Sequence, residues 1–336
     1  MSHVTMRELG KRLGVSAVTV SKALAGRSGV SEEMRQRIVR LADELGYVNP
    51  NAQAVRPESG LDVGILIPSN FFSSESFYAL LYKELVQCLT EAGHFGLLEL
   101  IPPEMRAGLV LPNLLRSRRV HALILLGQPE HAYLELLVRQ PLPVICMDFF
   151  DMNITADMVV GDSAGGTALL TQHLIDQGHR DIAFYGEVNA TSSIMERYLG
   201  YLSAMMCNGL PVPKDYRIAD RDAHGTLIPL TLPQKHPTAL VCNSDWSARW
   251  VIDQLRQQGL RVPEDISVVG YDDFDYTPPT VPALTTYRVN QVDMCRTAVR
   301  LIGERCAGDT KPCCRTVVGG KCIFRDSVQP LKKDSE

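Results

Sequence analysis

Residues 4–24, VTMRELGKRLGVSAVTVSKAL, contain two short helical patterns separated by a tight turn at residues 13–16. Thr5 is suited to cap the first helix, and Glu8, three residues later, completes a capping box. Ser16 is suited to cap the second helix, because its hydroxyl can accept a hydrogen bond from a free amide of the first turn. The pattern predicts two helices that pack across a sharp bend.

The side chains of this helix pair fall on two faces. The apolar residues that would meet across the bend are Leu9, Leu13, Val15, Val20 and Leu24. The residues that would point outward from the second helix are Ala17, Val18, Ser21 and Lys22. This is the layout of a helix-turn-helix, whose second helix enters a DNA major groove. An ordinary helical hairpin within a core is the alternative.

Residues 30–46, VSEEMRQRIVRLADELG, predict a third helix, with Ser31 as its cap and Gly46 as its stop. Residues 1–56 hold nine Lys or Arg and five Asp or Glu, a balance of +4. The whole chain carries −4, so the remainder carries −8. A basic head on an acidic body suits a segment that contacts phosphates, and a solvated basic surface is the alternative.

The composition of the remainder narrows the class of protein. A chain of 336 residues, 45% of them hydrophobic, is long enough for two or three domains. We find no apolar run of the ~18 residues needed to span a bilayer and no signal peptide, and we therefore expect a cytoplasmic protein. The nine cysteines fit neither a disulfide framework nor paired zinc ligands. They are expected to be reduced thiols, with no metal site and no cofactor.

Short apolar runs alternate with amphipathic helices from residue 62 onward, beginning with a helix expected from about Phe77 to Ala92. The predicted strands are Val63–Pro68, Val120–Leu126, Pro143–Met147, Asp181–Tyr185, Ala239–Cys242 and Ile266–Gly270. This alternation predicts an α/β body of parallel, doubly wound sheets behind an all-α headpiece. About 270 residues exceed a single core, so two lobes are expected.

Short motifs in a fixed order resemble the LacI/GalR family of bacterial transcription regulators, also called the lactose-repressor family. In the headpiece they are Val4-Thr5, Gly14-Val15-Ser16, Thr19-Val20-Ser21-Lys22, Val30-Ser31 and Gly46-Tyr47. In the body they are GHR at 178–180, RYLGY at 197–201, ISVVGYDD at 266–273, LTT at 284–286 and RDS at 325–327. The resemblance implies a body like a periplasmic sugar-binding protein, whose chain crosses between its lobes more than once.

The resemblance also implies domain boundaries. A headpiece is expected at 1–48, a hinge at 49–61 and an effector-binding, dimerising body at 62–330. Within the body, the N-lobe is expected at about 62–161, boundary crossings within 245–286, and the C-lobe at about 163–242 and 287–330. The individual crossings are expected near Asp162, near 243–245 and near 286–289.

Polar residues follow several predicted strands, where parallel sheets gather their ligands. Asp148 and Asp272 each follow a strand, and Ser193 and Arg197 lie beyond the strand that ends at Tyr185. An arginine fork and two carboxylates suit a small polyhydroxylated molecule such as a sugar, held between closing lobes. The predicted effector site comprises Phe77, Tyr78, Asp148, Ser193, Arg197, Trp246 and Asp272.

The family resemblance assigns effector contacts to the positions of Asp148, Ser193, Arg197 and Asp272, and stacking to Phe77 and Tyr78. Each position has a structural alternative. Asp148 could cap a loop, Arg197 could form a plain ion pair, and Asp273 is an equal rival of Asp272. The aromatic side chains, Trp246 among them, could simply pack in the core. Ser244 stands where many relatives have Asn, with neighbouring Asn243 as a substitute.

In the headpiece, we expect Ala17, Val18 and Lys22 to meet base edges. The residues expected to meet phosphates are Thr5, Ser16, Thr19 and Ser21. The linker lacks the family's minor-groove leucine and contains Pro57, which ends any helix near Arg56. Val55 is the remaining candidate for an apolar wedge in the minor groove.

These observations predict a sequence-specific DNA-binding regulator, a repressor whose operator affinity is controlled by an effector between its lobes. A homodimer is expected, whose two headpieces read the half-sites of a near-palindromic double-stranded operator. The family's tetramerising C-terminal zipper is expected to be absent, because the chain stops at Glu336 without a heptad tail. We expect no membrane partner and no enzyme, since GxGxxG, Walker and GxSxG motifs are missing. A purine-like corepressor and a solute-binding protein without DNA function are the alternatives.

Overall fold

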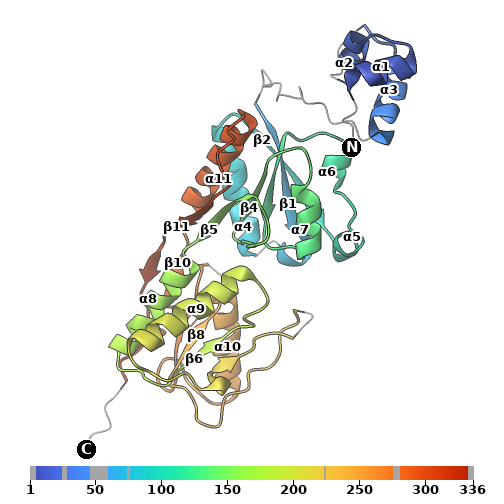
Figure 1. Cartoon of the computed structure of the whole chain (residues 1–336). Coiled ribbons are helices and arrows are strands. Elements are labelled where there is room, and N and C mark those ends of the chain that lie inside the picture. The colour runs from blue at the N-terminus through green and yellow to red at the C-terminus, as the bar shows by residue number, and fades with distance from the viewer. Residues whose placement is uncertain are drawn as a thin grey trace, which may run out of the picture. The chain divides into compact units, whose positions relative to one another are not determined.

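The computed structural model describes residues 5–24, 29–45, 60–73, 76–222, 225–274 and 281–331. The chain divides into two compact units, Met1–Val55 and Arg56–Glu336, which are described separately (Figure 1). The predicted wedge residue, Val55, and most of the predicted hinge lie outside the described residues. None of the helices in the described ranges is long and apolar enough to cross a membrane.

The first unit is a bundle of three helices, α1 (Met6–Leu13), α2 (Ala17–Leu24) and α3 (Glu32–Glu44). Thr5 caps α1 by accepting a hydrogen bond from the Glu8 amide at 3.3 Å. Ser16 Oγ accepts from the Thr19 amide at 3.1 Å, at the start of α2. The buried side chains that the three helices share are Leu9, Val20, Ala23, Ile38 and Ala42.

The bend between α1 and α2 depends on a close backbone approach. The Val15 amide donates to the Gly10 carbonyl at 2.9 Å. A Cβ on Gly10 would lie 2.5 Å from the Val15 carbonyl oxygen, closer than real Cβ atoms come. Gly14 ends α1 in the left-handed conformation with φ of 69°, which glycine adopts without strain. Two glycines therefore set the angle at which α2 leaves α1.

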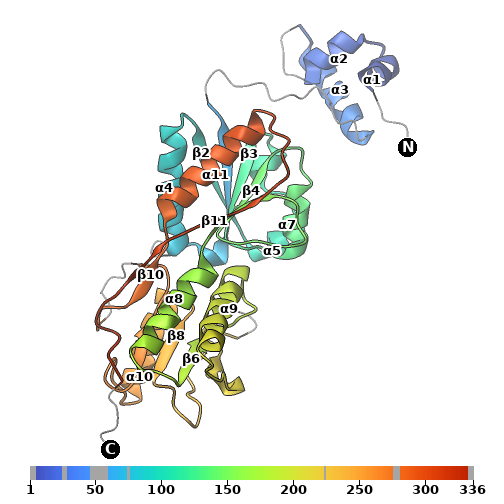
Figure 2. The same cartoon turned by 60° about the vertical axis from the view of Figure 1, so that its left-hand side comes forward.

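The N-lobe of the body is a parallel six-stranded sheet in the order β11-β5-β4-β3-β1-β2. Its strands are β1 (Asp62–Pro68), β2 (Phe95–Ile101), β3 (Ala122–Leu126), β4 (Val144–Met147), β5 (Asp157–Gly161) and β11 (Arg315–Val318). Helices α4 (Phe77–Glu91) and α11 (Gln291–Cys306) cover one face, and α5 (Pro103–Ala107) and α7 (His131–Val138) the other (Figures 1 and 2). Shorter helices are η1 (Ser69–Phe71) and α6 (Asn113–Arg116).

The C-lobe is a parallel four-stranded sheet in the order β7-β6-β8-β9. Its strands are β6 (Ile182–Tyr185), β7 (Arg217–Ile218), β8 (Ala239–Cys242) and β9 (Ser267–Val269). Helices α8 (Ser163–Asp176) and α9 (Ser192–Cys207) pack on one face and α10 (Asp245–Gln257) on the other (Figure 2). An antiparallel pair, β10 (Thr286–Arg288) with β12 (Lys321–Ile323), and η2 (Lys214–Tyr216) complete this lobe.

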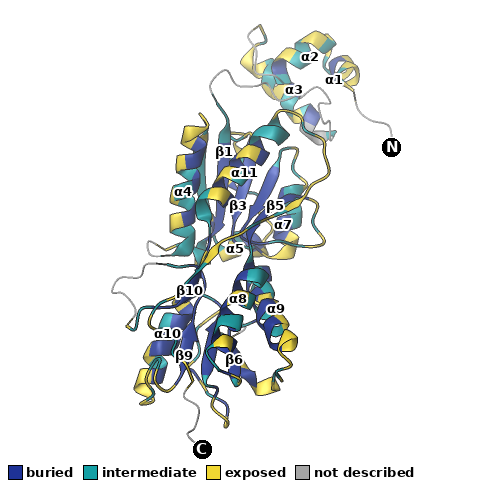
Figure 3. Cartoon of the chain, turned by 90° about the vertical axis from the view of Figure 1, so that its left-hand side faces the viewer, coloured by how far each residue is buried: buried dark blue, intermediate teal, exposed yellow. Residues whose placement is uncertain are grey.

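Burial explains why these runs form strands. Helices on both faces remove the central strands from water, so β3 is apolar and buried at all five positions (Figure 3). Two hydrophobic clusters fill the two faces of the N-lobe sheet. The predicted α/β class, with a helical headpiece and parallel sheets in the body, is confirmed.

The course of the chain between the lobes differs from the expected one. The chain crosses between the lobes after β5 at Asp162, after β10 near Val289, and between β11 and β12. The expected crossing near 243–245 is wrong, because Ser244 caps α10 directly after β8 and both elements belong to the C-lobe. Residues 245–274 therefore lie in the C-lobe, whereas α11 and β11 return to the N-lobe.

Candidate effector site and DNA-binding surface

Arg197 and Asp272 meet in the C-lobe at the carboxyl ends of its strands. Arg197 projects from α9 and is 6% exposed, while Asp272 follows β9 and is 9% exposed. Arg197 Nη2 lies 3.5 Å from Asp272 Oδ1, and Nη1 donates to the Asn243 carbonyl at 2.5 Å. The guanidinium carbon lies 3.9 Å from the centroid of the Tyr271 ring. The stacking on Tyr271 and the ion pair with Asp272 hold the Arg197 guanidinium in one orientation.

This pair is incomplete as a structural ion pair. Arg197 Nε is buried without a hydrogen-bond partner in the described part of the chain, and so is Asp272 Oδ1. Asp272 also has a φ of 118°, in a region that non-glycine residues rarely adopt. Unpaired buried polar atoms and a strained backbone cost free energy, and both are typical of sites that bind something else.

Asp148 and Tyr78 form the N-lobe part of the site. Asp148 follows β4, is 7% exposed and has a φ of 69°. Tyr78 lies in the first turn of α4, and its hydroxyl donates to Asp148 Oδ2 at 2.8 Å. Phe77 packs edge-on against Tyr78, with ring centroids 5.5 Å apart. Gly127 leaves room for this cluster, because a Cβ there would lie 3.1 Å from the Tyr78 ring.

The carboxyl groups of the site interact electrostatically across the two lobes. Burial raises the pKa of Asp272 to about 7; the Arg197 charge opposes this rise and the Asp148 charge adds to it. Burial also raises the pKa of Asp148, while Arg197 and the Tyr78 hydroxyl lower it. The pKa of Asp245, at the start of α10, is raised well above its usual range by burial and by Asp272. The Arg197 guanidinium therefore interacts with two buried carboxyl groups, those of Asp148 and Asp272, and Asp272 in turn acts on a third, that of Asp245.

Asp273, the adjacent carboxylate that is the alternative to Asp272, accepts hydrogen bonds on both of its oxygens. Asp273 accepts from Arg288 Nε at 2.5 Å and from Arg325 Nη2 at 2.6 Å. Arg288 ends β10 and Arg325 follows β12, so the two ion pairs connect Asp273 to segments next to two of the crossings between the lobes. The two adjacent carboxylates thus differ: Asp273 has arginine partners on both oxygens, whereas Asp272 has an oxygen without a hydrogen bond.

The remaining predicted effector residues lie at helix starts. Ser193 is half-buried in the first turn of α9, with its Oγ 3.0 Å from Thr191 Oγ1. Trp246 is 45% exposed in the first turn of α10. Asn243, the expected substitute for the missing family asparagine, donates through its amide to Asp220 Oδ2 at 2.8 Å.

The sequence did not single out a set of contacts that joins the lobes beside the site. The Ser192 amide donates to Gln128 Oε1 at 2.7 Å, and Ser192 Oγ accepts from the Phe150 amide at 3.0 Å. Arg315 of β11 pairs with Glu196 of α9 and lies over the Phe150 ring. Gln128 follows β3 at the same sheet edge as Asp148, so the strand-end rule could have found it.

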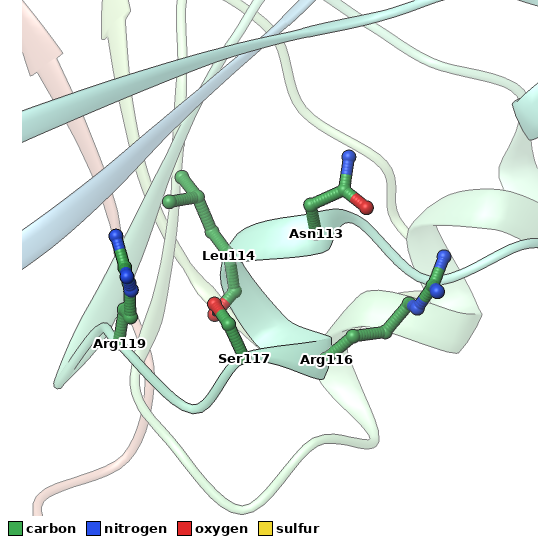
Figure 4. A pocket seen from close by; sticks show the side chains of 5 residues that line it. All are labelled: Asn113, Leu114, Arg116, Ser117 and Arg119. Atoms are coloured by element: carbon green, nitrogen blue, oxygen red, sulfur yellow. The ribbon is translucent and has the colours of Figure 1, made fainter.

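A separate hollow of about 510 Å³ lies on the N-lobe beside α6 (Figure 4). It is lined by Asn113, Leu114, Arg116, Ser117 and Arg119. The Asn113 and Leu114 amides donate to the Glu99 carboxylate at 2.7 and 2.8 Å. This hollow shares no residue with the Arg197 site.

In the headpiece, α2 presents an exposed face beside its buried one. Val18 is 63% exposed and Lys22 is exposed, whereas Ala17, Thr19 and Ser21 are half-buried. The hydroxyls of Ser16 and Thr19 lie 2.9 Å apart at the start of α2, and Thr5 stands at the start of α1. Three of the four residues expected to meet phosphates, Thr5, Ser16 and Thr19, thus lie at helix N-termini, where backbone amides favour anions, whereas Ser21 lies further along α2.

A three-helix headpiece joined to a two-lobed binding body defines a class of ligand-responsive DNA-binding regulators. Residues 5–51 match the model of bacterial regulatory proteins of the lacI family, and residues 171–328 match a periplasmic binding protein-like domain. The chain belongs to the lacI family of bacterial regulatory proteins and is a DNA-binding transcriptional regulator. The family resemblance of the sequence motifs is confirmed.

Named relatives cover nearly the full chain. The ribose operon repressor of Haemophilus influenzae is 25% identical over 333 residues, which is 98% of this chain and 99% of that protein. The transcriptional repressor PurR of Histophilus somni is 27% identical over 344 residues, 97% of this chain and 99% of that protein.

Solved structures share the fold. A complex of the transcriptional regulator CelR with cellobiose has a TM-score of 0.69 at 24% identity, covering 97% of this chain and 100% of that one. A lac repressor dimer bound to operator and an anti-inducer has a TM-score of 0.65 at 20% identity, covering 98% and 100%.

Proposed function

We propose that this regulator is a homodimeric repressor whose operator affinity is set by a sugar or sugar derivative bound between its lobes. The observation that carries the proposal is the cluster of Tyr78 and Asp148 from the N-lobe with Arg197 and Asp272 from the C-lobe. Asp148, Arg197 and Asp272 are buried and interact electrostatically, and Arg197 Nε and Asp272 Oδ1 lack a hydrogen-bond partner among the described residues. A hydroxyl-rich ligand supplies the missing donors and acceptors.

The proposed mechanism links this cluster to DNA through the angle between the lobes. Two headpieces in a dimer read two half-sites of a near-palindromic operator. Ala17, Val18 and Lys22 contact base edges, while Thr5, Ser16, Thr19 and Ser21 contact phosphates. Val55 is kept as the proposed minor-groove wedge. The effector acts only through its different affinity for the two lobe arrangements.

The effector contacts are shared between two kinds of side chain. Asp148, Ser193, Arg197 and Asp272 hydrogen-bond the hydroxyls of the ligand. Phe77, Tyr78 and Trp246 offer aromatic faces to the apolar side of its ring. The protein binds and releases this ligand without catalysis, a cofactor or a metal, and it acts in the cytoplasm at operators on the nucleoid.

A purine-like corepressor is the second candidate. The PurR relatives favour it, with 27% identity over nearly the whole chain. A planar base would stack on Tyr78, and its ring nitrogens would meet Asp272 and Arg197. The two candidates change operator affinity in opposite directions, because a corepressor strengthens operator binding whereas an inducer weakens it.

Fluorescence anisotropy on duplexes from the protein's own promoter tests the proposal. Operator affinity is measured at low salt with sugars, sugar phosphates and purines, because phosphate contacts weaken steeply as salt rises. We expect one sugar to change the affinity. Protein that ignores these duplexes under all conditions would contradict the assignment.

Arg197→Met tests the site within the same assay. The variant keeps an unbranched apolar chain in place of the aliphatic part of the arginine and removes the guanidinium that would bind the effector. We expect operator binding to persist and the effector response to disappear. The matched control is Arg217→Ala, an exposed arginine at the C-lobe edge strand, which should leave both unchanged. A normal response in the Met variant would place the effector elsewhere.

A further inference from the structure

The proposed effector site, made up of Asp148, Arg197 and Asp272 and called the cleft below, has more acidic than basic groups. Asp148, Asp245 and Asp272 are each at least nine-tenths buried, and Arg197 is the cation that interacts with two of them, Asp148 and Asp272. The carboxylates repel one another, since the Asp148 charge acts on Asp272 and the Asp272 charge acts on Asp245. Buried charges are weakly screened, so this repulsion extends to anything that enters the cleft.

Neighbouring arginines do not balance this excess of negative charge, because they form ion pairs with other carboxylates. Arg221 is bound to Asp220 through two hydrogen bonds of 3.0 and 2.6 Å. Arg288 and Arg325 both bind Asp273, on its two different oxygens. Within the described residues, the Arg197 fork is therefore the positive group with an open hydrogen-bond donor at the site.

The site contains one hydrogen-bond donor and one acceptor without partners among the described residues, and one kind of ligand group can satisfy both. Arg197 Nε needs an acceptor and Asp272 Oδ1 needs a donor, and the two belong to an ion pair whose closest atoms are 3.5 Å apart. One hydroxyl group satisfies both, because it accepts and donates at once. A carboxylate or phosphate would satisfy the guanidinium alone and would face the oxygens of Asp272 and Asp148 without a proton between them.

We infer that the cleft takes a hydroxyl-rich ligand without negative charge and rejects the phosphorylated or acidic form of the same sugar. The inference rests on the proposed function and narrows its ligand class. A buried anion beside uncompensated carboxylates is disfavoured by like-charge repulsion, whereas the neutral ring keeps every hydrogen bond. The expected discrimination is at least about tenfold in Kd.

Isothermal titration of the full-length protein with matched pairs tests this inference. The pairs are ribose with ribose 5-phosphate, glucose with glucose 6-phosphate and with glucuronate, and cellobiose with cellobionate, all at pH 7.5. We expect a neutral member to bind and its anionic partner to bind at least about tenfold more weakly. Tighter binding of an anionic member overturns the inference while leaving a sugar-derived effector in place. Operator binding without binding of any member overturns both the inference and the sugar effector.

A charge variant tests the cause of the discrimination. Asp272→Asn keeps the shape of the side chain and removes one negative charge from the cleft. We expect the Kd of the anionic member divided by the Kd of the neutral member to fall toward one in this variant, even where both members bind more weakly than to wild type. Asp253→Asn, on an exposed carboxylate of α10, should keep the wild-type ratio. An unchanged ratio in the Asp272 variant overturns the electrostatic explanation, and the wild-type ratio decides the inference where the variant binds neither member.

Discussion

Lys22 and Val18 are the exposed side chains of α2 that carry the expected sequence preference. We predict that Lys22→Ala relaxes base preference at one position of each half-site and costs ~1–3 kcal/mol of operator binding. The reason is that the ammonium group donates to guanine acceptors in the major groove. Anisotropy with operators substituted at single positions measures the effect.

The control for Lys22 is Lys11→Ala, in the last turn of α1 and outside the recognition helix. It should change affinity similarly for all sequences or leave it unchanged. An equal loss on every operator in the Lys22 variant would identify that residue as a phosphate contact.

Asp272 provides a prediction for pH. Its pKa is about 7 in the folded protein and 3.8 ordinarily. Between about pH 4 and 7 the folded state therefore holds a proton that the unfolded chain has released, so this carboxyl lowers stability as pH rises through that window. Asp272→Asn removes the effect, and its free energy of unfolding relative to wild type should rise from pH 5 to about pH 7 and then level off.

Urea unfolding at several pH values measures this difference. Asp253→Asn, on an exposed carboxylate away from the site, is the control for the substitution itself. Parallel curves for Asp272→Asn and wild type would show that Asp272 titrates in its ordinary range.

At the scale of helices and strands, patterns in the sequence located the elements with strong apolar runs. The run at 239–242 coincides with β8, and α4 begins at the predicted Phe77. The predicted strands do not include β2, β5, β7, β10, β11 or β12, and the first two of these show why. In β2 the side chains are mostly half-exposed at a sheet edge, and β5 begins with a buried Asp157 that binds Arg305. Neither strand has the continuous apolar signal of a central strand.

The sequence predicts those residues of the candidate site that follow a recognisable strand. The strand-end rule places Asp148 at the carboxyl edge of the N-lobe sheet and Asp272 at that of the C-lobe sheet, whereas Arg197 projects from α9. That the two edges face each other could not be predicted from either sheet alone. The choice of Asp272 over Asp273 could not be made from adjacent residues of the same type. It depends on Arg288 and Arg325, which approach from segments 15 and 52 residues away.

The helix-turn-helix supplies a prediction at the same scale. Gly10→Ala places a Cβ 2.5 Å from the Val15 carbonyl and forces the bend open. We expect a loss of headpiece stability of about 1–3 kcal/mol and of most operator affinity, with effector binding retained by the separate body. Calorimetric unfolding and anisotropy measure the two effects.

The matched substitution is Gly303→Ala in α11, where a Cβ would have nothing within 4 Å. It should be neutral or slightly stabilising, because alanine favours a helix over glycine. Normal operator binding by the Gly10 variant would contradict the close packing of the bend.

For the whole molecule, effector and operator must influence each other equally. If the effector changes operator affinity by a given factor, the operator changes effector affinity by the same factor. We expect a factor of about 5 to 150, the usual range for such coupling. Titration of the effector with and without saturating operator duplex measures one side, and anisotropy measures the other. A scrambled duplex is the control, and unequal factors would show that the two ligands bind different assemblies.

The return of the chain to the N-lobe also constrains how the protein is made. The six-stranded sheet accepts its edge strand, β11, only after the whole C-lobe up to β10 has been synthesised. Until then β5 offers a bare row of amides and carbonyls, the kind of edge to which other chains add. A nascent polypeptide stalled before residue 318 is thus the species that would rely most on a chaperone, and premature stop codons between those for β10 and β11 should yield aggregates rather than a shortened regulator.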